Sequence, residues 1–214
     1  MRRLIVVRHG RTAWNATNRF QGQADIPLDE IGQAQAAAMA KVVGAEQPST
    51  IWSSDLSRAQ ATAQAIADVV GVPIRTDPVF REIFTGDWEG LTGQQVQQRW
   101  PAEWERWHAG QDIVRSGGAE TREQVGRRFG DALSRVAEAI DDERCTVVVG
   151  HGTAIRAGIC QFVGYAPGSE WLFGSLHNCH WVLLAARGAA AEAVAAPIGR
   201  GWRVAGYNLG VDLR

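Results

Sequence analysis

The sequence has little net charge, few cysteines and no long apolar run. Its 22 basic and 23 acidic side chains leave a net charge of −1 with no basic block, which argues against a nucleic-acid partner. Apolar stretches are too short for a membrane-spanning helix, and the start lacks the apolar region and cleavage site of a signal peptide. Cys145, Cys160 and Cys179 are an odd number without paired spacing, so we expect reduced thiols in a cytoplasmic protein with no membrane partner.

Short apolar runs alternate with amphipathic segments along the chain. The apolar runs predict strands at 3–8, 50–53, 72–76 and 146–149, and two later ones at 181–186 and 203–207. Helical spacing predicts helices at 29–45, 56–70, 120–140 and 153–163. This alternation is typical of an α/β protein with a largely parallel sheet covered on both faces, and the length fits one domain, 1–214. The alanine-rich segment 186–196 is a hairpin or loose loop between the late strands, which are free to pair with a second subunit in a homodimer.

An aromatic helical stretch interrupts this alternation, and we assign it to a lid-like insertion at about 92–118. Pro101 divides the stretch, although proline is tolerated in a first helical turn. Trp100, Trp104 and Trp107 recur at helical spacing. They therefore either pack the lid onto the body of the domain or offer a stacking surface to a substrate.

Arg8-His9-Gly10 ends the first apolar run and is the most informative feature of the chain. A neutral histidine can attack a phosphoryl group while a neighbouring arginine holds the phosphate oxygens. The second ring nitrogen of His9 then needs an acceptor, for which we expect a backbone carbonyl. A second pair, His151-Gly152, follows another apolar run. Because ligands bind beyond the carboxyl ends of parallel strands, we expect the two pairs to meet at one edge of the sheet.

A helix start supplies a second cation. Arg58 lies in the first turn of a predicted helix that we expect Ser54 or Asp55 to cap. A helix N-terminus with an arginine is a good anion site. His151, if protonated, adds a charged donor to a phosphoryl oxygen.

Three carboxylates compete for the role of proton donor. A carboxylic acid beside a phosphate can protonate the leaving alcohol and later deprotonate a water. Chemistry alone leaves this role open among Glu82, Asp87 and Glu89.

The chain resembles the histidine phosphatase superfamily, also called the phosphoglycerate-mutase-like family, through the ordered blocks RHG, SSDLSRAQATA, REIFTGDWEG and GHGT. The resemblance runs from Leu4 to about Gly164. It implies a three-layer α/β/α sandwich and a metal-independent phosphomonoester hydrolase that works through a phosphohistidine, without a metal or cofactor. It implies that His9 is the nucleophile and Glu82 the proton donor. It also implies a phosphate pocket made by Arg8, Arg58 and His151. The positions it implies as substrate-binding are Arg8, Asn15, Gln21, Gly22, Arg58, His151 and Gly152.

Within this family the chain is more similar to the phosphatase branch than to the cofactor-dependent phosphoglycerate mutases, which remain the alternative. The mutases usually carry serine where this chain has Gln21, and His-Tyr-Gly where it has Phe-Thr-Gly at 84–86. They also bring paired arginines over the site, whereas the lid region here has scattered ones, Arg99, Arg106 and Arg115. The pattern looks most like actinobacterial members, so we expect a small phosphorylated metabolite, a phosphoglycerate or sugar phosphate derivative.

The run His177-Asn178-Cys179-His180 invites a metal-site interpretation. On a strand, His177 and Cys179 would share a face while His180 points away, and no second pair of ligands is visible. We therefore expect no metal site there.

Two other functions compete with a phosphatase. A binding protein that has lost catalysis would usually lack one of the residues implied above, and this chain keeps them. A relay protein whose His9 receives phosphate from a partner stays open.

Overall fold

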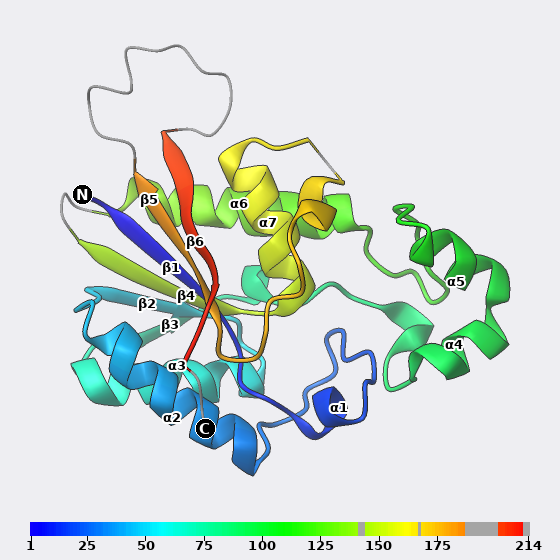
Figure 1. Ribbon diagram of the computed structural model, residues 1–214, viewed down its shortest axis with the longest axis horizontal. Coiled ribbons are helices and arrows are strands. Elements are labelled where there is room, and N and C mark those ends of the chain that lie inside the picture. Colours follow the sequence, from blue (N-terminus) through cyan, green and yellow to red (C-terminus); the bar gives the residue numbers. More distant parts are fainter. Residues whose placement is uncertain (141–143, 167, 187–200, 212–214) are drawn as a thin grey trace.

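The computed structural model describes residues 1–140, 144–166, 168–186 and 201–211, around one six-stranded sheet (Figure 1). The strands are β1 (Arg3–Arg8), β2 (Thr50–Ser53), β3 (Ile74–Thr76), β4 (Cys145–Gly150), β5 (Trp181–Ala186) and β6 (Trp202–Leu209). Their order across the sheet is β3-β2-β4-β1-β5-β6. The pairs among β1 to β4 are parallel, and β5 and β6 are added antiparallel. The mainly parallel mixed sheet that we predicted is confirmed.

Helices cover both faces of the sheet. The long ones are α2 (Glu30–Gly44), α3 (Ser57–Val70), α6 (Arg122–Glu138) and α7 (Gly152–Val163). Successive side chains of a strand point to opposite faces, so Leu4 and Val6 of β1 pack with α6 and α7. Ile5 and Val7 pack with α2 and α3 on the other face. The interior of β1, Leu4 to Val7, is therefore apolar, and the molecule has three layers, α/β/α (Figure 1).

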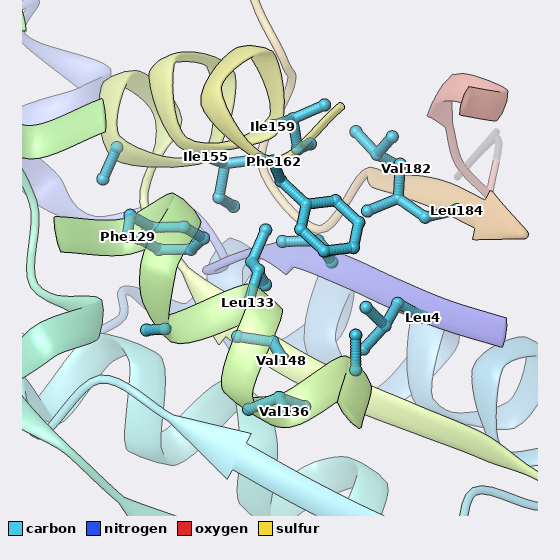
Figure 2. Close-up of a cluster of buried hydrophobic side chains, with 14 of the residues drawn as sticks. Leu4, Phe129, Leu133, Val136, Val148, Ile155, Ile159, Phe162, Val182 and Leu184 are labelled. Carbon is cyan, nitrogen blue, oxygen red and sulfur yellow. The ribbon is translucent and has the colours of Figure 1, made fainter. Parts of the chain in front are cut away.

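The core between the sheet and α6 and α7 brings aromatic and aliphatic side chains together (Figure 2). Phe129 of α6 faces α7, and its ring lies 5.3 Å from that of Phe80, centroid to centroid. A Cβ on Gly158 would come within 2.5 Å of Phe129 Cδ1. Glycine at this position therefore lets α7 approach the Phe129 ring closely.

The remaining elements are short. They are α1 (Ala13–Ala16), η1 (Pro78–Phe80), η2 (Gly86–Trp88), α4 (Gly93–Arg99), α5 (Pro101–His108) and η3 (Ser169–Leu172). The aromatic stretch is thus two helices that meet at Trp100, because Pro101 occupies the first position of α5, where its missing N–H costs nothing. α4 and α5 lie at one side of the molecule, away from the sheet (Figure 1). Except for Ala186, the predicted loop 186–196 lies outside the described residues.

Within the described ranges, no helix combines the length and apolar character that a membrane span requires.

Candidate active site

Parallel strands deliver polar residues to one edge of the sheet. β1 ends at Arg8 and is followed by His9, β2 is followed by Ser54, and β4 ends at Gly150 and is followed by His151. Because Arg8 pairs with Gly150, His9 and His151 leave adjacent strands at the same level. Their ring centroids are 5.1 Å apart. The structure thus brings the two His-Gly pairs together as the sequence predicted.

His9 is buried and holds a defined ring orientation. Its Nδ1 lies 2.7 Å from the carbonyl oxygen of Gly10, whose N–H donates to Thr62 Oγ1 at 3.0 Å. Since a carbonyl oxygen can only accept, Nδ1 carries the proton and Nε2 keeps its lone pair. Burial, followed by the charges of Arg58 and Arg8, holds the pKa of His9 well below its ordinary value of 6.5. The ring is therefore neutral, with the backbone-carbonyl partner that we expected.

His151 is also buried, and both of its ring nitrogens have partners. Nδ1 accepts from Arg58 Nε at 3.2 Å, which leaves the proton on Nε2, 2.9 Å from Ser54 Oγ. Burial, then the charges of Arg58, His9 and Arg8, hold the pKa of His151 well below 6.5. The structure therefore contains a neutral His151, whereas a bound phosphoryl dianion would favour its protonated form.

The start of α3 differs from the expectation. Leu56 is the N-cap residue and its side chain makes no capping hydrogen bond, whereas Asp25 Oδ1, far away in the sequence, accepts from the Ser57 N–H at 2.8 Å. Ser54 Oγ instead accepts from Leu56 N–H at 3.3 Å and contacts His151, while Asp55 forms a bidentate pair with Arg81 at 2.7 and 2.6 Å. The predicted cap by Ser54 or Asp55 is wrong because more distant partners engage both side chains.

Arg58 is fully buried, and each nitrogen of its guanidinium group donates a hydrogen bond. Nε donates to His151, NH1 to the carbonyl of Ala24 at 2.6 Å and NH2 to the carbonyl of Gly22 at 2.9 Å. Burial lowers the pKa of Arg58 to about 10, which leaves the group charged at neutral pH. Arg58 therefore ties the loop at 22–24 to His151.

Arg8 has a donor with no protein partner. NH1 donates to the carbonyl of Leu176, but Nε is buried without a hydrogen-bond partner among the described residues. A Cβ on Gly152 would lie 3.4 Å from this Nε, so the guanidinium group lies against the first residue of α7. Burial lowers the pKa of Arg8, and the Glu82 carboxylate opposes this effect. An unpaired buried donor beside a helix N-terminus suits an anion.

Glu82 lies at the N-terminus of α7. Its Oε1 accepts from the N–H groups of Ile83 and Ala154, both at 2.8 Å, and its Oε2 accepts from Thr153 N–H at 3.1 Å. These bonds satisfy two of the free N–H groups that begin α7. The carboxylate is thereby held beside the two histidine-bearing strand ends.

The structure separates the three candidate carboxylates. Glu82 is the acidic group with the largest effect on the pKa values of Arg8 and Arg58, and it raises both. Glu89 is turned to the backbone N–H of Gln23, at 2.6 Å. Asp87 is exposed. Geometry therefore favours Glu82, the residue that the family resemblance implied.

The predicted mouth residues gather around Thr12. Asn15 Oδ1 accepts from the Thr12 N–H at 3.1 Å, and Gln21 Oε1 accepts from Thr12 Oγ1 at 3.0 Å. Gly22 follows Gln21 and is bound through its carbonyl to Arg58. These residues thus lie on the loop that follows β1, next to the histidine pair.

From the sequence we considered 177–180 only as a metal site and missed the contact of the segment Leu176–His180, which we call the strap, with His9. Cys179 N–H donates to the carbonyls of Arg8 at 3.0 Å and His9 at 3.2 Å. Asn178 Nδ2 donates to the His9 carbonyl at 3.0 Å. The strap precedes β5, whose first residue lies beside the end of β1 because the two strands are antiparallel. A single sequence gives no sign of that neighbour, so the contact could not be predicted.

The strand geometry assumed for 177–180 is wrong. The segment is a turn ahead of β5, with Cys179 at a φ of 56°. The rings of His177 and His180 lie 5.0 Å apart, and His180 Nδ1 is bonded to the carbonyl of Asn208 at 2.9 Å. No cluster that could hold a metal ion occurs in the part of the chain that the structure describes.

Two tryptophans of the 92–118 segment contact rings outside it. The Trp107 ring lies 5.7 Å from that of the buried Trp88 and 5.6 Å from that of Phe20. Trp104 lies 6.2 Å from Trp88, whereas Trp100 is the junction of α4 and α5. These contacts favour the packing interpretation of the aromatic face.

A cavity of about 270 Å³ lies elsewhere, between α6 and the β2–β3 edge, against Trp52, Phe80 and Val136. None of the predicted site residues lines it. Charges and hydrogen bonds, not cavity size, therefore locate the candidate site.

Comparison with known proteins gives consistent matches along the chain. Residues 4–196 match the family model described as histidine phosphatase superfamily (branch 1). A glucosyl-3-phosphoglycerate phosphatase from Mycolicibacterium vanbaalenii is 36% identical over 191 residues, 86% of this chain and 84% of the relative. A probable phosphoglycerate mutase from Yersinia enterocolitica is 34% identical over 183 residues, 84% of this chain and 82% of the relative. A solved mycobacterial glucosyl-3-phosphoglycerate phosphatase in complex with VO3 has a TM-score of 0.85 and 32% identity, covering 98% of this chain and 100% of that one.

Proposed function

The chain belongs to branch 1 of the histidine phosphatase superfamily and is a phosphatase of that superfamily, and we propose that it hydrolyses phosphomonoesters through a phosphohistidine formed at His9. The observation that carries this proposal is the state of His9. Its buried ring is neutral, Nδ1 is engaged by Gly10, and Nε2 keeps the lone pair that nucleophilic attack requires. Arg8 and Arg58 supply the positive charge that a phosphoryl group needs, so the mechanism calls for no metal or cofactor.

In the first step, His9 Nε2 attacks phosphorus in line with the ester oxygen. A nitrogen–phosphorus bond forms, the phosphorus–oxygen bond to the alcohol breaks, and Glu82 gives its proton to the departing oxygen. The Nε of Arg8, which has no partner among the described residues, would donate to an equatorial phosphoryl oxygen. Negative charge close to His151 favours its protonation, which would make it a further donor.

In the second step, water replaces the alcohol. Glu82, now a carboxylate, takes a proton from the water, whose oxygen attacks phosphorus as the bond to His9 Nε2 breaks. Inorganic phosphate leaves, and both His9 and Glu82 return to their starting forms. Each proton that Glu82 gives in the first step is thus recovered in the second.

The substrate class that we propose is a small phosphorylated metabolite, a phosphoglycerate or sugar phosphate derivative. Glucosyl-3-phosphoglycerate is the leading candidate, because relatives named glucosyl-3-phosphoglycerate phosphatase match most of the chain. We also propose that 92–118, which contains α4 and α5, is a lid over the site. Assembly as a homodimer stays a prediction.

The mutase alternative requires a second anion-binding group over the site. Arg115 is buried and held within the protein, because its NH2 donates to the carbonyls of Phe84 and Glu120 and its guanidinium lies over Trp88, although its Nε has no hydrogen-bond partner among the described residues. Arg106 is exposed and bonded to Gln111. These positions support hydrolysis over transfer to a second phosphoglycerate oxygen, although two relatives are named as probable phosphoglycerate mutases.

Phosphate release from a panel of esters tests the proposal. The panel contains glucosyl-3-phosphoglycerate, 3-phosphoglycerate and p-nitrophenyl phosphate, each with and without chelator, beside a His9→Ala variant. We expect release that survives the chelator, is absent from the variant, and passes through an acid-labile phosphoprotein.

Two results would point elsewhere. Interconversion of 2- and 3-phosphoglycerate in the presence of bisphosphoglycerate, without net release, would make the protein a mutase. A phosphoprotein that water does not cleave would favour the relay function.

A further inference from the structure

The strap (Leu176–His180) holds the backbone on which the proposed nucleophile sits. Arg8 N–H donates to the His180 carbonyl at 3.0 Å, and Cys179 N–H donates back to the carbonyls of Arg8 and His9. The side chain of Arg8 reaches the Leu176 carbonyl. The strap therefore fixes the end of β1 from the side opposite to β4.

Asn178 is the strap residue whose side chain contacts His9. Its Nδ2 donates to the His9 carbonyl at 3.0 Å and to Asn15 Oδ1 at 3.2 Å. One amide group thus connects the nucleophile to Asn15 of α1, on the loop that carries the mouth residues. Asn178 is half-buried.

The peptide that joins His9 to Gly10 is held at both ends. Its carbonyl accepts from Asn178 Nδ2 and Cys179 N–H, and its N–H donates to Thr62 Oγ1. The carbonyl of Gly10, which belongs to the next peptide group, accepts a hydrogen bond from His9 Nδ1. A rotation of the His9–Gly10 peptide would move the Gly10 carbonyl and break its hydrogen bond with His9 Nδ1. The ring could then change to the tautomer with its proton on Nε2.

The strap is itself anchored, which keeps the Asn178 amide in place. Asn208 of β6 accepts from the His177 N–H through Oδ1 at 2.9 Å, and its carbonyl bonds to His180 Nδ1 at 2.9 Å. β6 pairs with β5, which pairs with β1. The amide is therefore positioned by the sheet and not by a free loop.

We propose that Asn178 is a positioning residue for the phosphatase reaction, holding the His9–Gly10 peptide so that His9 keeps its proton on Nδ1 and presents Nε2 to phosphorus. This rests on the proposed role of His9. Removing the side chain leaves the Cys179 N–H as a remaining donor to the His9 carbonyl, so the effect is partial. A misplacement of a reacting group by about 1 Å can cost about 10²-fold in rate, so a partial loss of positioning is expected to cost up to that factor.

The test compares wild type with Asn178→Ala, Asn178→Asp and His177→Ala. Aspartate has the size of asparagine but cannot donate when ionised, and it would face two oxygens, those of His9 and Asn15. His177 is the matched control, because it is exposed in the same strap and donates no side-chain bond to His9 in the described part of the chain.

Two measurements are made on each variant. Rapid-quench single turnover with p-nitrophenyl phosphate gives the rate of His9 phosphorylation, and ¹⁵N NMR of the histidine rings gives the tautomer of His9. For both Asn178 variants we expect phosphorylation slower by about tenfold to hundredfold, a nearly unchanged KM, and loss of the pure Nδ1–H signature. His177→Ala should match wild type in both readouts.

The outcomes separate this inference from the proposed function. If wild type forms no phosphohistidine, the proposed function fails. If wild type forms it and Asn178→Asp forms it equally fast with an unchanged tautomer, the role of Asn178 is refuted, even where Asn178→Ala folds poorly. Equal losses in the Asn178 variants and His177→Ala would show a general disturbance of the strap and would also overturn the proposal.

Discussion

Replacing Glu82 by glutamine separates its chemical role from its structural one. Glutamine keeps one carbonyl oxygen, which can still accept from the N–H groups of Ile83 and Ala154, as Oε1 does now. The bond from Thr153 N–H to Oε2 is lost, and an amide NH2 group faces that donor instead. Because the group is half-buried at a helix start, we expect a loss of about 1–2 kcal/mol in the free energy of unfolding.

The effect on activity is larger and depends on the leaving group. General acid catalysis contributes about 10²- to 10⁴-fold, so we expect kcat for alkyl esters such as 3-phosphoglycerate to fall by that factor. The p-nitrophenolate ion leaves without a proton, so the first step with p-nitrophenyl phosphate should change little. The second step still needs Glu82 as base, so Glu82→Gln should release a burst of p-nitrophenolate equivalent to its active sites and then slow down.

Glu89→Gln is the matched control. Glu89 also accepts a backbone hydrogen bond, from Gln23 N–H, and lies near enough to Arg58 to raise its pKa. Its replacement should leave the ratio of alkyl to aryl ester rates unchanged. Equal losses for both esters in Glu82→Gln, with no burst, would refute the acid–base assignment and leave Glu82 as a structural cap of α7.

Three further predictions follow from the geometry. Folding lowers the pKa values of His9 and His151 below 6.5, so the unfolded chain binds more protons in acid. The free energy of unfolding should therefore fall as the pH drops below 6.5, by up to about 1.4 kcal/mol per pH unit for each ring. Urea unfolding at several pH values would contradict this if the free energy of unfolding changed with pH equally in wild type and in the His9→Asn and His151→Asn variants. Gly158→Ala places a Cβ against Phe129 and should cost about 1–3 kcal/mol in thermal unfolding, which Phe129→Leu should partly restore; an unchanged Tm would show that α7 shifts freely. Arg8→Gln removes the unpaired buried donor and should lower kcat/KM by about 10²- to 10³-fold in steady-state assays, and a variant with wild-type kcat/KM would exclude a phosphate contact.

Local patterns were enough to predict the layers of the fold and the strand ends. β1 is apolar at every interior position because helices cover both of its faces, and that run is visible in the sequence. Arg8, His9 and His151 follow such runs directly, so their place at the sheet edge could be predicted. The break that Pro101 predicts in the aromatic stretch is also found, since α4 ends at Arg99 and α5 begins at Pro101.

Contacts between a side chain and a group far away in the sequence could not be predicted. Arg58 donates to the carbonyls of Gly22 and Ala24, and backbone carbonyls leave no residue-specific pattern in a sequence. Serine is a residue type that often caps helices, but the hydroxyl of Ser54 contacts His151, whose Nε2 the fold brings within 2.9 Å of Ser54 Oγ. Asn178 belongs to the same class, since its role depends on β5 running antiparallel beside β1.

The position of β1 in the sheet explains why the site forms there. β1 has β4 on one side in parallel register and β5 on the other in antiparallel register. The parallel neighbour ends at the same level, so it can supply His151 opposite His9, whereas the antiparallel neighbour begins at that level and supplies the strap. Because side chains alternate along a strand, a slip of one residue between β1 and β4 would turn His151 away from His9. The register of Arg8 with Gly150 therefore specifies the site as much as the identity of the two histidines does.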